Sequence, residues 1–136
     1  DGQVLIIGGW HNEEEVPTRK IFEYNPKEPS WAKTSHLDSP VCFCSATTTI
    51  DGDILVTGGG ENMFQGSAVY DSCNVKRCGR FVWEPFPPML SKRCGHESVT
   101  HYDDSSIVLG GYGGESDYLN TVERFDWGTG VWNPLP

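Results

Sequence analysis

The sequence predicts an all-β fold built from three repeated units, because three kinds of marker residue recur together. Glycine pairs recur about 50 residues apart, single tryptophans recur at nearly the same spacing, and an aromatic residue lies between each glycine pair and its tryptophan. A shared period of about 50 in unrelated residue types is the signature of a repeat protein. The markers, unit by unit, are Gly8, Gly9, Tyr24 and Trp31; then Gly58, Gly59, Tyr70 and Trp83; then Gly110, Gly111, Phe125 and Trp132.

Short runs typical of β-strands surround the glycine pairs. Around the middle pair these runs are residues 43–50, 54–59, 67–72 and 80–86. They are rich in β-branched or alternating residues, and Asp51-Gly52 between the first two is a tight hairpin signal. No window of the chain shows the i, i+3, i+4 pattern of an amphipathic helix. Each unit is therefore predicted to form four short antiparallel strands, the meander of one propeller blade.

The marker residues have a physical role in this prediction. A glycine pair at a strand end adopts positive φ and lets a neighbouring blade approach where a Cβ would interfere. The aromatic residue and the tryptophan supply large apolar faces to bury between adjacent blades. Because one blade cannot cover its own apolar faces, the pattern must repeat.

Residues 87–136 resemble a kelch repeat along nearly their whole length. The resemblance rests on the Arg-x-Gly-His sequence at 93–96, the glycine pair that follows, the strand 122–126 and the final Trp132. It extends through three units of approximately 1–50, 51–102 and 103–136, the first of which lacks its inner strand. The resemblance implies a kelch-type β-propeller segment of three blades, each a four-stranded antiparallel meander. Because propellers close with about four to eight blades, the segment is expected either to belong to a larger ring of about six blades or to be a half-ring that forms a homodimer.

Composition narrows the class of partner. The formal net charge is −9, which disfavours nucleic acid and anionic membranes, since both attract positive charge. No apolar run is long enough to span a bilayer, and the glycine-rich loops lack a phosphate-binding motif, so no cofactor is expected. Five cysteines, an odd number, and the absence of an N-glycosylation sequon favour a cytoplasmic location, with a secreted protein as the alternative.

The cysteines offer two candidate sites. Aligning the units pairs Cys42 and Cys44 with Cys94 and His96, which formally makes a four-ligand zinc set. Equivalent positions in neighbouring sheets lie about 10 Å apart, however, so these residues are predicted to be buried and structural, with no metal. Cys73 and Cys78 are predicted to bracket a loop that closes on itself, as a disulfide in a secreted protein or otherwise as an exposed thiol pair.

Loops on one rim of the predicted blades form the candidate binding surface. In a four-stranded meander, the loop joining strands two and three lies at the same end as the loop leading into strand one. Aromatic residues and arginine commonly anchor protein interfaces. The candidate partner-binding residues on this rim are Trp10, Phe64, Arg93, Tyr112 and Tyr118.

The resemblance also implies a function for this rim. In the kelch family the rim commonly binds a protein or peptide, and an arginine in the loop before the inner strand contributes charge-assisted bonds; here only Arg93 matches. The chain is thus predicted to be a non-enzymatic protein-interaction module, suited to a substrate-recruiting or scaffold role. Replacing Arg93 and Tyr112 together by alanine is predicted to abolish partner capture without altering thermal unfolding.

One enzymatic alternative stays open. The segment 69–87 is faintly similar to the cysteine-bearing blades of copper-radical oxidases of the galactose oxidase and glyoxal oxidase type, which are built on kelch-like propellers. Their chemistry requires a tyrosine cross-linked to cysteine, a second tyrosine and two histidines around copper. Residues 91–98 offer no tyrosine, so missing blades would have to supply ligands.

Overall fold

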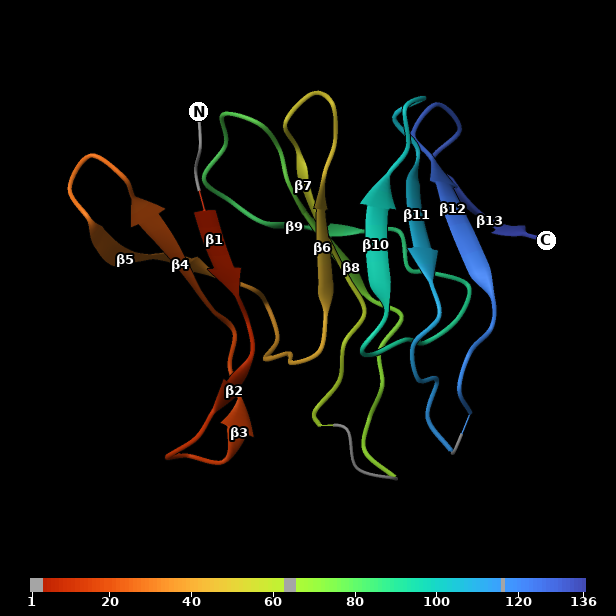
Figure 1. Cartoon of the computed structure of the whole chain (residues 1–136), viewed down its shortest axis with the longest axis horizontal. Coiled ribbons are helices and arrows are strands. Elements are labelled where there is room, and N and C mark those ends of the chain that lie inside the picture. The colour runs from red at the N-terminus through yellow and green to blue at the C-terminus, as the bar shows by residue number, and fades with distance from the viewer. Residues whose placement is uncertain (1–3, 63–65, 116) are drawn as a thin grey trace.

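The computed structural model describes residues 4–62, 66–115 and 117–136, and the described chain is entirely β-structure and loops. Three antiparallel sheets stand side by side in chain order, from the red first sheet to the blue last one (Figure 1). Across the described ranges, no helix is long and apolar enough to cross a membrane. The sheets have the strand order of a simple meander, as predicted.

The first sheet has three strands in the order β1-β4-β5. Its strands are β1 (Val4–Ile7), β4 (Lys20–Asn25) and β5 (Ser30–His36). A small two-stranded ribbon of β2 (Trp10–His11) and β3 (Val16–Pro17) projects from the end of β1. Within residues 4–62, this sheet shows three strands and not the inner strand that the other two possess, in agreement with the sequence.

The second and third sheets have four strands each, with every neighbouring pair antiparallel. The second contains β6 (Ser45–Thr48), β7 (Ile54–Thr57), β8 (Cys73–Lys76) and β9 (Glu84–Phe86). The third contains β10 (Glu97–Thr100), β11 (Ser106–Leu109), β12 (Val122–Asp126) and β13 (Val131–Leu135). The sheets are offset from the units of sequence by one strand. The second unit begins at residue 51 and the third at residue 103, whereas the second and third sheets begin with β6 and β10, which precede those residues.

The third strand of the second sheet differs from the prediction. It was expected at 67–72 with a loop after it, but β8 begins at Cys73, and Leu55 of β7 pairs with Val75. Cys73 and Val75 are both buried, so this register turns two apolar side chains toward the third sheet. The prediction was wrong because residues 67–72, with Ala, Val and Tyr at their centre, also have a strand-like composition.

The same shift changes the role of Tyr70. Tyr24 pairs with Val4, and Phe125 occupies the matching place opposite Ser106, so these two aromatic markers are equivalent. In the second sheet Lys76 holds that place, paired with Ile54. The assignment of Tyr70 as the equivalent marker was therefore wrong. Tyr70 precedes β8, and its side chain packs instead against the apolar cluster between the first and second sheets.

The core lies between sheets rather than within one sheet. One buried cluster joins the second and third sheets through Leu55, Cys73, Val75, Met89, Val108, Phe125 and Trp132. A second cluster joins the first and second sheets through Ile21, Leu37, Val41 and Val56, with Trp83 packed against it. Burial of these faces removes apolar area from water, at about 25 cal/mol per Å², and is the main force that holds neighbouring sheets together.

The glycine pairs are the joints between sheets, as predicted. Gly8 and Gly58 have φ of 64° and 55°, and a Cβ on either would lie within 2.5 Å or 2.3 Å of the carbonyl oxygen of Val41 or Arg93, respectively. The next glycine of each pair donates its N–H to that same oxygen, Gly9 to Val41 at 2.8 Å and Gly59 to Arg93 at 2.7 Å. The close approach of the loop before the next sheet therefore requires glycine.

Candidate functional site

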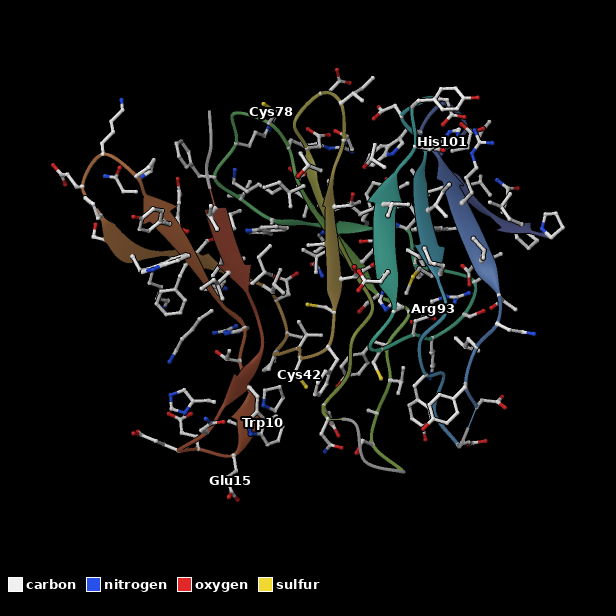
Figure 2. All side chains as sticks on the ribbon, viewed as in Figure 1. Trp10, Glu15, Cys42, Cys78, Arg93 and His101 are labelled. Carbon is white, nitrogen blue, oxygen red and sulfur yellow. The ribbon has the colours of Figure 1, made fainter. Side chains whose placement is uncertain are left out.

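The loops predicted to share one end of the molecule do so. The β2–β3 ribbon, the loop between β7 and β8, and the loop between β11 and β12 hang side by side below the sheets in Figure 1. We call this end the rim and define it as the described residues of 10–17, 60–70 and 112–118 with the leading loops 37–44 and 90–96. Figure 2 shows Trp10, Glu15 and Cys42 at this end, whereas Cys78 and His101 lie at the opposite end.

Main-chain hydrogen bonds fasten the leading loops to the long rim loops. Cys42 and Gly60 exchange N–H···O bonds of 3.0 Å and 2.9 Å, and Cys94 and Tyr112 exchange two of 2.9 Å. The loops therefore do not depend on side chains alone for their positions. Function often resides in loops that a rigid sheet positions in this way.

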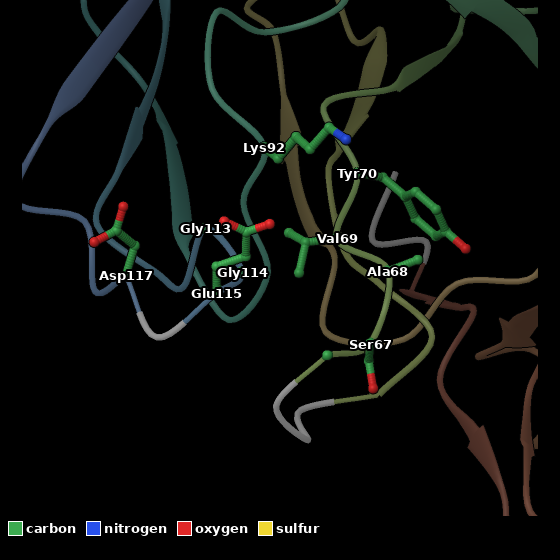
Figure 3. A pocket seen from close by; sticks show the side chains of 10 residues that line it. Ser67, Ala68, Val69, Tyr70, Lys92, Gly113, Gly114, Glu115 and Asp117 are labelled. Carbon is green, nitrogen blue, oxygen red and sulfur yellow. The ribbon is translucent and has the colours of Figure 1, made fainter.

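A groove of about 500 Å³ opens on the rim between the second and third sheets (Figure 3). One wall comes from residues 66–70 of the β7–β8 loop, and the other comes from residues 113–117 of the β11–β12 loop, of which 116 is not described. Lys92 of the leading loop also lines the groove, as do Glu115 and Asp117. The groove is thus shallow, partly charged and built entirely from loops.

Two of the predicted partner-binding residues are exposed on the rim. Trp10 in β2 is 40% exposed, and Tyr118 is 85% exposed with its ring centroid 5.6 Å from that of Tyr112. Tyr112 itself is buried in a small cluster with Val69 and Cys94, so it supports the loop and offers little surface to a partner. The expectation for Tyr112 therefore needs correction. Phe64 lies outside the described residues.

Arg93 is the main correction to the predicted site. Its side chain is 0% exposed, and it forms an ion pair of 2.9 Å with the equally buried Glu123 of β12. The remaining guanidinium donors bind the carbonyl oxygens of Gly110 (2.8 Å) and Thr121 (3.0 Å) and the hydroxyl of Thr121 (2.8 Å). Arg93 therefore ties the leading loop to its own sheet, and the prediction that it binds a partner through this group was wrong.

His96 follows two residues later and is also structural. Its Nε2 shares a hydrogen bond of 2.8 Å with the Thr57 hydroxyl of the second sheet, and its Nδ1 is buried with no hydrogen-bond partner in the described chain. Burial, and then the positive charge of Arg93, lowers the pKa of His96 to about 4. The imidazole is therefore neutral at neutral pH and joins two sheets.

The cysteines near His96 are buried or half-buried thiols, as predicted. Cys42 donates its Sγ–H toward the carbonyl oxygens of Gly60 and Glu61, both at 3.2 Å, and burial raises its pKa to about 11. Burial also raises the pKa of the Cys44 thiol. In the parts of the chain that the structure describes, no three His, Cys, Asp or Glu side chains come together as metal ligands.

Cys73 and Cys78 do not form the predicted pair. Cys73 begins β8 and faces the core, where burial raises the pKa of its thiol to about 12. Cys78 is exposed beyond the other end of this strand, and both thiols are free. A strand rises about 3.3 Å per residue, so the two Cα atoms are too far apart for a disulfide, which needs about 7 Å or less. The prediction failed because the intervening residues form a strand instead of a loop.

Sequence reasoning missed Phe43, which is also on the rim. Phe43 has φ of 56° and is 44% exposed, at the position where the third sheet has Gly95 with φ of 59°. A bulky residue in this conformation is uncommon, because its Cβ is crowded. The signal was available, because the alignment of Cys42 with Cys94 also places Phe43 opposite Gly95. A solvent-facing aromatic side chain in a strained backbone is a functional candidate.

Comparisons with known proteins agree with this architecture. Residues 107–136 match the Kelch motif. Kelch-like protein 35 of Mus musculus is 31% identical over 140 residues, which cover 99% of this chain and 21% of that protein. Kelch-like protein 38 of Rattus norvegicus is 26% identical over 97% of this chain and 22% of its own length. An F-box/kelch-repeat protein of Arabidopsis thaliana is 26% identical over 98% of this chain and 33% of its own length.

The relatives are much longer than this chain. It spans about a fifth of the length of the Kelch-like proteins that it matches. In all three cases nearly the whole chain is matched, so the similarity is not confined to the segment that carries the motif. Together with three meander sheets joined by glycine pairs, these matches show that the chain is similar to kelch-repeat proteins over nearly its whole length.

Proposed function

We propose that this kelch-repeat interaction module is non-enzymatic and takes a protein or peptide partner on the rim. The observation that carries the proposal is the exposure of aromatic side chains there: Trp10, Phe43 and Tyr118 are 40%, 44% and 85% exposed around loops that the sheets hold in place. Burying an aromatic side chain of this size in an interface contributes a few kcal/mol, and such residues are common binding hot spots.

A role as the substrate-recruiting or scaffold part of a larger protein fits the relatives. One of them is, by name, an F-box/kelch-repeat protein, so kelch repeats occur there beside another domain. The outward faces of the first and third sheets expose Val4, Ile6, Val99 and Val131. We propose that further blades, or a second copy of the chain, cover these faces and leave the rim open for the partner.

Selection of peptides from a displayed random library tests the rim. The library is selected in parallel on the wild-type chain and on a variant with Trp10→Ala and Tyr118→Ala. A control variant carries Phe81→Ala and Tyr102→Ala, which removes two aromatic side chains that are 89% exposed in loops at the opposite end. Wild type and control should enrich the same peptides, and the rim variant should lose them. Equal enrichment by all three chains would contradict the proposal.

A further inference from the structure

We infer that the rim recognises a positively charged segment, one that carries several lysine or arginine residues. The inference rests on the proposed function of the rim and specifies its partner. It is carried by three features of the described residues: the charge of the long rim loops, the burial of Arg93, and the aromatic side chains that lie among the carboxylates.

The only residues of the long rim loops that carry a formal charge are acidic. The segments 10–17, 60–70 and 112–118 contain no lysine or arginine. Their acidic residues, all exposed, are Glu13, Glu14, Glu15, Glu61, Glu115 and Asp117. None of these side chains takes part in an ion pair within the described chain. Their charges are therefore available to a partner.

The leading loop of the third sheet does not neutralise these carboxylates. Arg93, which could have attracted an acidic partner, is buried, and Glu123 already balances its charge. Lys92 is exposed and lines the groove, so it is the cation that this loop presents. With exposed Asp38 of the first leading loop, the rim carries seven carboxylates against the ammonium group of Lys92, so an acidic segment docking there would meet like charges.

The groove brings two carboxylates and one ammonium group close to one another. Figure 3 shows Glu115 and Asp117 on the β11–β12 loop and Lys92 above them, whereas the Tyr70 ring extends away from them beyond Val69. Carboxylates accept charge-assisted hydrogen bonds from guanidinium and ammonium groups. Exposed aromatic faces attract the same groups through cation–π contacts.

The placement of the loops favours an extended partner over a single residue. The ribbon, the β7–β8 loop and the β11–β12 loop follow one another along the lower edge of Figure 1, and each carries at least one exposed carboxylate. An extended chain laid across this edge would meet the carboxylates of the ribbon, then that of the β7–β8 loop, then those of the β11–β12 loop. The exposed side chains of Trp10, Phe43 and Tyr118 belong to the same rim, so basic and apolar side chains of the partner would both find partners.

Two labelled peptides test the charge of the partner. A fluorescein-labelled twelve-residue peptide of alternating Arg and Gly is titrated with the 136-residue chain, and its Glu-Gly counterpart is titrated in parallel, both followed by fluorescence anisotropy. The Arg-Gly peptide should bind and should weaken as salt rises, because added ions screen exposed charges. The Glu-Gly peptide should not bind.

Matched variants separate the rim from the overall negative charge. A rim variant with Glu14→Gln, Glu115→Gln and Asp117→Asn should weaken binding of the Arg-Gly peptide about tenfold, since each exposed charge pair contributes up to about 1 kcal/mol. A control with Glu28→Gln, Asp51→Asn and Glu84→Gln removes the same charge from exposed positions off the rim and should change the affinity less than about twofold. Lys92→Gln should strengthen binding about twofold to threefold.

Each contrary result has a distinct meaning. No binding of the Arg-Gly peptide, or equal loss in rim and control variants, would overturn the inference of a basic partner. Rim-dependent binding of the Glu-Gly peptide, or rim-dependent library peptides without excess lysine and arginine, would also overturn it but would leave the proposed function standing. Library selection that ignores the rim altogether would remove the proposed function itself.

Discussion

Trp132 and Trp31 occupy equivalent places in two sheets but have very different surroundings. Each lies opposite an aromatic residue of the neighbouring strand: Trp132 is 5.3 Å from the ring of Phe125, and Trp31 is 5.1 Å from that of Tyr24. Trp132 is 4% exposed and donates its Nε1–H to the carbonyl of Pro87 at 2.9 Å, but Trp31 is 49% exposed.

The difference shows that burial of the tryptophan comes from the neighbouring sheet. Trp132 packs in the seam between the second and third sheets, which we define by the cluster that contains Leu55, Val75, Phe125 and Trp132. No sheet in the described part of the chain lies on the corresponding side of the first sheet. A repeat tryptophan therefore contributes most of its stabilisation only when a neighbouring sheet covers it, which agrees with the need of such units to stack.

The largest expected effect tests this comparison directly. Trp132→Ala should lower the free energy of unfolding by about 4 kcal/mol, because it empties a packed seam. Trp31→Ala should lower it by about 1 kcal/mol, since about half of that side chain is already in water. Urea denaturation followed by circular dichroism measures both. Equal losses of unfolding free energy in the two variants would contradict the difference between the two sites and would indicate that the face around Trp31 is covered in solution.

Arg93 provides the next largest effect in the third sheet. Arg93→Ala should destabilise the chain by about 3 kcal/mol, because it leaves the carboxylate of Glu123 buried without its cation. The second sheet suggests a replacement for this ion pair that keeps the fold. Val41 holds the position equivalent to Arg93 there, and Asn74 holds the position equivalent to Glu123. Arg93→Val combined with Glu123→Asn should therefore recover most of the loss, measured by the same denaturation. A double variant as unstable as Arg93→Ala would show that the ion pair itself is needed.

This expectation also changes the test that the sequence suggested. Replacing Arg93 and Tyr112 together should reduce thermal stability, because both side chains are buried. A loss of partner capture in that variant would say little about the rim. Trp10 and Tyr118 are better positions, since both are far more exposed than Arg93 and Tyr112 and their replacement should affect folding less.

The repeat architecture was predictable because short sequence motifs mark each unit. Glycine pairs such as Gly8-Gly9 and Gly58-Gly59 mark strand ends, and a shared period needs no knowledge of three-dimensional contacts. The alignment of the three units on their glycine pairs also predicted that the first unit would lack its inner strand. Tyr70 was misassigned because an aromatic residue near a strand looks like the marker, whereas only the pairing of Leu55 with Val75 fixes the register.

The site was less predictable, because its character depends on distant partners. Arg93 sits in a loop whose sequence suggests an exposed cation, and its partner Glu123 is 30 residues away in β12. Nothing local in the sequence indicates that the two would be buried together. Because Arg93 is buried, Lys92 is the cation that its loop exposes, and the formal charge of the rim is negative.

The smallest of these effects on stability is its dependence on pH, which tests how well the contact between the second and third sheets excludes water. His96 bridges to Thr57 of the second sheet, and its pKa of about 4 lies below the value of about 6.5 for an unfolded histidine. The folded pKa is lowered, so the stabilisation is complete above about pH 6.5 and is lost as pH falls toward 4, where the unfolded chain binds the extra proton first.

Between pH 7 and pH 5 the free energy of unfolding should fall by about 2 kcal/mol through His96 alone. A His96→Gln variant, which can keep a hydrogen bond to Thr57 but does not titrate, should lack this part of the fall. Urea denaturation of both chains at the two pH values measures the difference. The same slope in both would mean that the seam is hydrated enough for His96 to ionise in place, and that sheet-to-sheet burial there is weaker than at Trp132.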